Sequence, residues 1–163
     1  MPGAEYHVTA RANRQEFILE SDHVKELFLH VLQRAKKKYD FKIRNFCIMS
    51  NHVHLMIRPG KKESLSKIMQ WILSVFAIQF NKIYEIHGHV WYDRFRSTIT
   101  EGYYQLLNTF LYIALNPVRA GLVQYCFEYT YNGIRFIQEN VYELLEPPDQ
   151  ISQYGLFLLD VNQ

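Results

Sequence analysis

Two strand-like segments separated by only two residues constrain the fold of this chain more than any other feature. Residues 41–49 and 52–58 have the apolar and β-branched character of strands, and Ser50-Asn51 between them is typical of a tight turn. Strands joined by so short a connection must pair antiparallel, because a parallel pair needs a long crossover. Residues 41–58 are therefore predicted to form a β-hairpin.

A strand and a helix are predicted before the hairpin. Residues 6–10, Tyr-His-Val-Thr-Ala, alternate in the manner of a short strand. Ser21 is a suitable N-cap for a helix that reaches about residue 39, and the lysines at 36–38 interact favourably with the dipole at its end. Helical spacing predicts that its buried face consists of Val24, Leu27, Phe28, Val31, Leu32 and Ala35.

Two helices and a strand are predicted after the hairpin. Ser64 begins a helix that ends near residue 85, and residues 95–99 form a fourth strand. Thr100 is the expected cap of a third helix that runs to about residue 115. Asn116-Pro117 should end that helix, because proline disfavours helical geometry in the residue before it.

This order of elements is typical of an α+β, ferredoxin-like fold, in which an antiparallel sheet carries its two helices on one face. The third helix is an addition at the C-terminal side. We assign residues 1–123 to this domain. Residues 124–163 are interpreted as a C-terminal extension packed on the same domain, with a short helix over 131–142 and an unassigned tail after Pro147-Pro148.

Charge is distributed unevenly along the chain. Residues 1–123 contain 17 Lys and Arg against 10 Asp and Glu, a net charge of +7, whereas residues 124–163 contain 1 against 6, a net charge of −5. A basic body suits a polyanionic ligand such as nucleic acid. An ordinary solvated surface can also produce such a split, so charge alone does not decide between the two interpretations.

Composition narrows the class of protein. With 48% hydrophobic and 15% aromatic residues, the chain is predicted to be folded rather than disordered. Cys47 and Cys126 form no metal or redox motif and are expected to be reduced core residues of a cytoplasmic protein. No apolar run has the length of a signal peptide core or a membrane span, so no membrane partner is expected.

His52 and His54 form the first candidate site. Side chains alternate along a strand, so Val53, Leu55 and Ile57 share one face and the two histidines share the other. Two imidazoles on one face of a rigid strand can bind one divalent cation. Seven histidines in 163 residues also produce such a pair by chance, so a metal site and a pair of ordinary histidines both remain open at this point.

The third predicted helix carries the second candidate site. At about 100° per residue, its apolar face consists of Tyr103, Leu106, Leu107, Phe110, Leu111 and Ala114. The opposite, polar face includes Tyr112 and Asn116, which lie one turn apart and can approach one target together. A surface tyrosine and a helix-capping asparagine are the alternative interpretation.

Basic and aromatic residues are interleaved over residues 91–96. Arg94 and Arg96 can bind phosphates, while Trp91 can stack on an unpaired base. An aromatic strand with two solvated arginines is the alternative. Further candidate contacts to phosphate are Lys61, Lys62, Lys67 and Arg119.

Together, these segments resemble a known family. His52-Val53-His54 is similar to the His-hydrophobe-His motif of the HUH endonucleases, and residues 112–121 are similar to the nucleophile segment of single-tyrosine transposases. Residues 112–117, Tyr-Ile-Ala-Leu-Asn-Pro, most resemble the corresponding segment of the REP-associated tyrosine transposases. Residues 88–97 match another block typical of those proteins. The resemblance covers residues 6–123, and the segment after Gly121 fits it loosely.

The resemblance implies a metal-dependent transposase that cleaves and joins single-stranded or hairpin DNA. Tyr112, on the added helix, would be the nucleophile and would keep the 5′ phosphate. His52, His54 and Asn116 would bind Mg²⁺ or Mn²⁺, although related insertion-sequence enzymes have glutamine in place of Asn116. A monomer and a homodimer both fit the resemblance, with the tyrosine acting in its own subunit or in a partner's site.

Two other functions stay open at this stage. A domesticated relative could bind structured single-stranded DNA or RNA without transposing, and its sequence could be nearly identical. A metal-dependent phosphoesterase could use water as its nucleophile, with Tyr112 incidental. A covalent adduct between the protein and DNA would exclude the phosphoesterase, because a water nucleophile leaves no such adduct.

Overall fold

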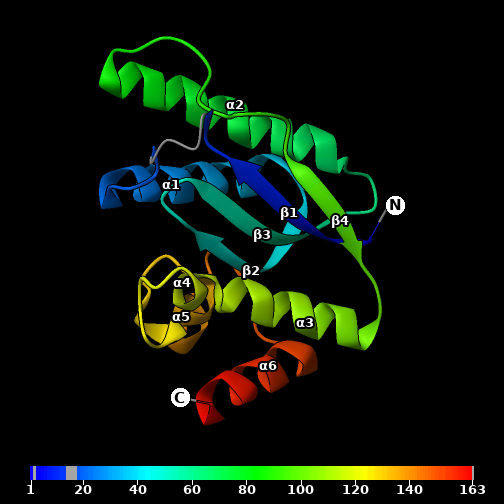
Figure 1. Cartoon of the computed structure of the whole chain (residues 1–163). Coiled ribbons are helices and arrows are strands. Elements are labelled where there is room, and N and C mark those ends of the chain that lie inside the picture. Colours follow the sequence, from blue (N-terminus) through cyan, green and yellow to red (C-terminus); the bar gives the residue numbers. More distant parts are fainter. Residues whose placement is uncertain (2, 14–17, 163) are drawn as a thin grey trace.

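The computed structural model describes residues 1, 3–13 and 18–162, and its elements follow the predicted order (Figure 1). The strands are β1 (Glu5–Arg11), β2 (Phe41–Ile48), β3 (His52–Pro59) and β4 (Arg96–Thr100). The helices are α1 (Asp22–Lys38), α2 (Leu65–Tyr84), α3 (Gly102–Ala114), α4 (Asn116–Arg119), the short 3₁₀ helix η2 (Cys126–Glu128), α5 (Gly133–Gln138) and α6 (Gln150–Val161).

The four strands form one antiparallel sheet in the order β2-β3-β1-β4. The predicted hairpin is present as β2 and β3, and β1 lies between β3 and β4. In this register Thr9 of β1 pairs with His54 on one side and with Arg96 on the other. The predicted α+β, ferredoxin-like arrangement is therefore confirmed, and it places β1 beside the strand that carries the two histidines.

Helices cover both faces of this sheet. α1 and α2 pack against each other on one face, where the side chains of Phe28 and Phe76 are fully buried (Figure 1). α3 lies across the other face, over β2 and β3. Because both faces are covered, Leu55 and Met56 of β3 are both fully buried although they point in opposite directions.

The boundaries of α3 differ from the sequence prediction at both ends. Thr100 is the last residue of β4, and its hydroxyl donates to the carbonyl oxygen of Glu5 (3.0 Å), so the N-cap of α3 is Glu101. At the other end, the chain leaves regular helical geometry at Leu115, and Asn116 begins α4. Pro117 is tolerated there because the first turn of a helix has no intrahelical partner for a backbone N–H.

The C-terminal segment packs against α3. The predicted helix over 131–142 is limited to α5, and α6 is a helix that the sequence pattern did not indicate. Asp149 caps α6 by accepting from the backbone N–H of Ser152 (3.0 Å), and it also accepts from Arg44. The guanidinium of Arg44 pairs in turn with Glu5 (2.7 Å). This largely buried network ties the start of α6 to β1 and β2.

The composition predicted reduced cysteines in the core and no membrane-spanning segment. Cys47 and Cys126 are free and buried. Burial raises the pKa of the Cys47 thiol well above its usual range, which keeps it neutral and unreactive. None of the described helices combines the length and the apolar character needed to span a membrane.

A close contact at Gly155 determines how α6 sits on α3. A Cβ atom added to Gly155 would lie 2.6 Å from Cδ1 of Phe110, well inside van der Waals contact. We expect Gly155→Ala to lower the free energy of unfolding by about 1–3 kcal/mol, in spite of the higher helix propensity of alanine. Urea unfolding would measure this. The exposed Asp160→Ala in the same helix is the control, and equal effects of the two substitutions would contradict the close packing.

Candidate active site

His52 and His54 lie on the face of the sheet that α3 partly covers. Val53 and Leu55 point to the other face and are fully buried against α1 and α2, as the alternation of β3 predicts. The two imidazole ring centroids are 4.8 Å apart. His54 is 5% exposed, whereas His52, at the start of β3, is half-buried. The strand therefore holds two neighbouring imidazoles, one deep and one closer to solvent.

His54 is held at both ring nitrogens. Its Nδ1 lies 2.9 Å from Nε2 of His7 and 3.2 Å from Oγ1 of Thr9, both on β1. Its Nε2 lies 3.0 Å from the amide Nδ2 of Asn116. When this amide donates to Nε2, the proton of the neutral ring is on Nδ1 and is donated to β1. The ring orientation of His54 is thus fixed by two elements that are distant in the sequence.

His52 has a similar but more local support. Its Nδ1 lies 2.7 Å from Oδ1 of Asn51, the residue before it. An amide oxygen accepts, so Nδ1 carries the proton and Nε2 has a free lone pair. Burial lowers the pKa of His52, and the nearby Asn116 side chain offsets only part of this effect. His52 is thus oriented mainly by its neighbour in the strand, whereas the Asn116 amide bonds to His54.

All three histidines of this cluster favour the neutral form. Burial is the largest cause for His54, whose pKa falls to about 3, and the nearby charges of His52, His7, Arg119 and Arg11 lower it further. Burial followed by Arg11 lowers the pKa of His52, and burial lowers that of His7. Because these pKa values are lowered, the three imidazoles are neutral at physiological pH. Neutral imidazole is the form that binds a metal ion.

Two buried asparagine side chains position α3 over this cluster. The Nδ2 atom of Asn45, on β2, donates to the carbonyl oxygen of Phe110 (3.1 Å). The Nδ2 atom of Asn132 donates to the carbonyl oxygen of Ala114 (2.9 Å), at the end of the helix. Both asparagines are fully buried, and the two bonds lie on either side of Tyr112 in the helix. They fix the part of α3 that carries Tyr112.

Tyr112 points from α3 toward the histidine cluster and toward solvent. Its ring centroid lies 5.8 Å from that of His54 and 5.7 Å from that of His7, and the side chain is 47% exposed. The guanidinium of Arg119 lies 4.1 Å from the ring centroid and donates to the carbonyl oxygen of Tyr112 (2.6 Å). An open surface hollow of about 410 Å³ gives access to the tyrosine and is lined by His7, Gln105, Asn108, Thr109 and Tyr112.

Residues 1–116 of this chain match a family model described as "Transposase IS200 like", and this range includes His52, His54, Tyr112 and Asn116. The chain belongs to the IS200-like transposase family. It is accordingly a DNA transposase. No curated protein matches the chain in sequence.

Two solved structures are similar to this transposase in fold. One is a REP-associated tyrosine transposase bound to a REP hairpin, with 18% identity, 93% of this chain and 92% of that chain covered, and a TM-score of 0.73. The other is described as a candidate transposase from Deinococcus radiodurans R1, with 13% identity, 62% and 82% covered, and a TM-score of 0.52. The first match extends beyond residue 116, so its fold likeness includes part of the C-terminal segment.

One tyrosine of α3 lies elsewhere than the sequence predicted. Tyr103 was expected in the core, but it is 45% exposed and its ring packs edge-on against Tyr104. The buried residues of α3 begin with Leu107, because the sheet and α6 cover only the later turns of the helix. The helical spacing was correct for Leu107, Phe110 and Ala114, and the first turn extends past the surface that would bury it.

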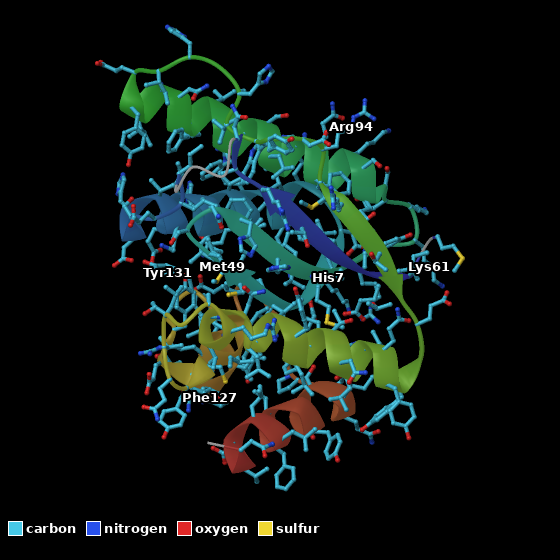
Figure 2. The ribbon with its side chains drawn as sticks, in the orientation of Figure 1. His7, Met49, Lys61, Arg94, Phe127 and Tyr131 are labelled. Atoms are coloured by element: carbon cyan, nitrogen blue, oxygen red, sulfur yellow. The ribbon has the colours of Figure 1, made fainter. Side chains whose placement is uncertain are left out.

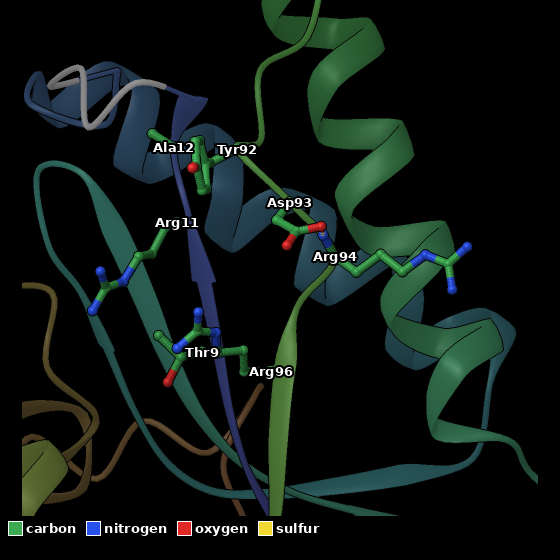
Figure 3. Close-up of a pocket in the computed structure, with 7 residues that line it drawn as sticks. All are labelled: Thr9, Arg11, Ala12, Tyr92, Asp93, Arg94 and Arg96. Atoms are coloured by element: carbon green, nitrogen blue, oxygen red, sulfur yellow. Dashed lines mark hydrogen bonds between the residues drawn. The ribbon is translucent and has the colours of Figure 1, made fainter.

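The arginines predicted to contact DNA point in different directions. Thr9 and Arg96 are paired in the sheet and share the face of His54. Figure 3 shows Arg11 and Arg96 directed toward the same space, whereas Arg94 extends away from them. Arg119, by contrast, lies directly on the Tyr112 ring. The structure thus brings Arg96 and Arg119 to the histidine face of the transposase and turns Arg94 away from it.

Trp91 packs into the protein. Its indole Nε1 donates to the carbonyl oxygen of Leu73 (2.9 Å), and its ring contacts the rings of Phe28 and Phe76. The indole is therefore committed to the core under α2, and it anchors the segment that follows it.

The predicted lysines lie apart from the histidine cluster. Lys61 and Lys62 follow the C-terminal end of β3, whereas His52 begins that strand, and Lys67 is in the first turn of α2. Figure 2 shows Lys61 at one edge of the molecule and His7 near its centre. All three lysines are exposed. They would contact DNA only where it extends beyond the candidate site.

His7, Thr9 and Arg11 are site residues that sequence analysis missed. The alternation of residues 6–10 already places His7 and Thr9 on one face of a strand. What the sequence did not contain was the pairing of β1 with β3, which sets Thr9 opposite His54 and Arg11 opposite His52. A search for polar residues on one face of every predicted strand could have found them.

The depressed pKa of His54 makes a prediction for the metal-free transposase. Its pKa is 6.5 when unfolded and about 3 when folded, so the unfolded state binds more protons between these values. The contribution of His54 to stability is present above pH 6.5 and is lost, by about 1 kcal/mol per pH unit, as the pH falls toward 3. Urea unfolding between pH 7.5 and 4.5 in EDTA should show a smaller loss for His54→Gln. His30→Gln, at an exposed position, is the control, and identical pH profiles of His54→Gln and the wild-type protein would contradict the assignment.

Proposed function

We propose that this transposase cleaves and rejoins single-stranded DNA through a covalent intermediate on Tyr112. The observation that carries the proposal is the convergence of three elements: Tyr112 of α3 lies against His54 of β3 and His7 of β1, and Asn116, one turn after the tyrosine, contacts His54. A tyrosine that only filled a surface position would not need two buried amides to fix its helix.

The proposed cofactor is Mg²⁺ or Mn²⁺ bound by His52, His54 and Asn116. Among the residues that the structure describes, no three His, Cys, Asp or Glu side chains are grouped to hold a metal ion, and we therefore assign the third protein ligand to the amide oxygen of Asn116. Rotating the Asn116 amide by half a turn brings Oδ1 to the position where Nδ2 now meets Nε2 of His54. At the present separation of 3.0 Å, this oxygen and Nε2 of His54 would be close enough to bind one divalent ion together.

The residues of the chain can then be assigned to the steps of the reaction. A bound divalent ion would polarise the scissile phosphate and orient it. The phenol oxygen of Tyr112 forms a bond to phosphorus and loses its proton, while the bond from phosphorus to the 3′ oxygen breaks and that oxygen gains a proton. Arg119, held on the ring, stabilises the negative charge that develops on the phenol oxygen. Because one phosphodiester replaces another, a 3′-OH can reverse the step and join strands.

Hairpin or single-stranded DNA is the proposed substrate. One of the similar folds reported above is that of a REP-associated tyrosine transposase bound to a REP hairpin. The net charge of +7 over residues 1–123 and the arginines around the histidine face suit a nucleic acid backbone. The hollow beside Tyr112 gives access to the tyrosine and to His7 of the cluster.

Tyr112→Phe should abolish cleavage and leave the fold and DNA affinity unchanged, because the substitution removes only the attacking oxygen. The assay is incubation with hairpin oligonucleotides and Mn²⁺, followed by denaturing gels and peptide mapping of the covalent adduct. Tyr104→Phe, in the same helix and 79% exposed, is the matched control and should keep wild-type activity. An adduct mapped to another tyrosine would overturn the proposal.

Removal of the metal should also stop cleavage. We expect EDTA to abolish adduct formation and added Mn²⁺ to restore it, and His52→Ala to need far more Mn²⁺ or to be inactive. Asn116→Ala should weaken Mn²⁺ binding at least as much as the loss of a residue that only orients a ligand, which is about 10–100-fold, whereas Asn116→Asp, which keeps an oxygen ligand, should largely retain it. Isothermal titration with Mn²⁺ measures the affinities without DNA. Full activity in EDTA would exclude this cofactor.

A further inference from the structure

A second hollow adjoins the histidine cluster at the end of β1. It has a volume of about 420 Å³ and lies between β1 and the segment that leads into β4 (Figure 3). Its lining includes Thr9, Arg11, Tyr92, Asp93, Arg94 and Arg96, and the side chain of Arg94 extends away from those of Arg11 and Arg96. Thr9 also contacts His54, and Arg11 is paired with His52 in the sheet. The hollow is therefore next to the proposed active site, within reach of a nucleotide adjacent to the one bound there.

The wall of this hollow is held rigidly in place. The backbone N–H of Tyr92 donates to the carbonyl oxygen of Arg11 (2.9 Å), and that of Asn13 donates to the carbonyl oxygen of Val90 (2.7 Å). Between these two bonds, the Trp91 indole is anchored in the core. A site formed in this way needs little reorganisation when a ligand binds.

Two arginines give the hollow a strongly cationic side. Arg11 and Arg96 are directed toward the same space in Figure 3, and Arg96 is exposed. Neither forms an ion pair with a carboxylate in the part of the chain that the structure describes. Arginines without carboxylate partners beside a site for a phosphodiester are suited to bind the next phosphate of the strand.

Asp93 is unexpected in such a place, because a carboxylate repels a phosphate. One of its oxygens accepts from the backbone N–H of Arg94 (2.7 Å), which fixes the side chain. The other oxygen has no hydrogen-bond partner among the described residues, and no described basic side chain pairs with Asp93. An oriented carboxylate oxygen is an acceptor for the amino group of a base, as in the reading of cytosine N4. Tyr92, 67% exposed beside it, offers a ring for stacking.

We propose that this hollow binds one nucleotide of the single strand next to the scissile phosphate and selects a base that has an exocyclic amino group. Arg11 and Arg96 bind its phosphate, Tyr92 stacks on its base, and Asp93 accepts from the amino group. Adenine, cytosine and guanine satisfy this acceptor, whereas thymine presents carbonyl oxygens at the corresponding positions. The inference rests on the proposed function, since it takes the position of the scissile phosphate from that proposal.

The test uses the full chain with the Tyr112→Phe substitution, so that binding is measured without cleavage. The probes are fluorescein-labelled thymidine 12-mers that contain one dA, dC or dG, compared by fluorescence anisotropy with the all-thymidine 12-mer. We expect a preference of about tenfold for at least one amino-bearing base. Asp93→Ala should remove this preference, and Asp93→Asn, which keeps an acceptor oxygen, should retain part of it. Asp160→Ala, a carboxylate on the distant α6, should leave it unchanged.

Arg96→Ala should act differently from Asp93→Ala. It should weaken the binding of all four probes equally, and the salt dependence of binding should fall by the equivalent of about one phosphate contact. Equal affinity of the four probes for the Tyr112→Phe protein, or a preference that survives Asp93→Ala, would overturn the inference. Such a result together with an adduct on Tyr112 in the wild-type protein would leave the proposed function standing. A base preference that depends on Asp93, with no adduct on Tyr112, would support base selection by the hollow and contradict the proposed function.

Discussion

The docking of α3 against the sheet is the contact on which the candidate site depends. A bulge in β2 between Ile43 and Asn45 inserts one extra residue, Arg44, into the strand. Asn45 then donates to α3, while Arg44 binds Asp149 at the start of α6. One irregularity in an edge strand thus supports both α3 and the start of α6, which packs on α3.

The position of α3 on the sheet can shift very little without loss of these contacts. The 3.0 Å contact between His54 and Asn116 joins a strand to the turn after α3, and a shift of about 1 Å in the helix would break it. Asn132 gives a partner to the carbonyl oxygen of Ala114, one of the groups that a helix end leaves unpaired. Gly133 packs so closely on Asn45 that an added Cβ would lie 2.4 Å from its Oδ1. The C-terminal segment therefore acts as a support for the helix that carries Tyr112.

Electrostatics links the histidine cluster to the expected ligand. Arg11 and Arg119 lower the pKa of His54, in addition to the effect of burial. The same two charges remain close to the site and attract a polyanion. A phosphodiester that binds there would partly neutralise the arginines, while the uncharged imidazoles keep their lone pairs for a cation. The cluster is thus suited to bind a metal ion and a phosphate together, which neither the histidines nor the arginines would do alone.

The sequence by itself determined the local features of this protein. The period of two in residues 52–58 placed His52 and His54 on one face, and the period of 3.6 in the third helix placed Tyr112 and Asn116 together, because both depend on backbone geometry over a few residues. The tertiary structure decided which distant segments meet. It set His7 and Thr9 against His54, since strand register depends on the packing of the whole sheet, and it turned Arg94 away from Arg96. It also exposed Tyr103 and ordered α6, because the burial of a helix face depends on whether another element lies opposite it, and no local pattern contains that information.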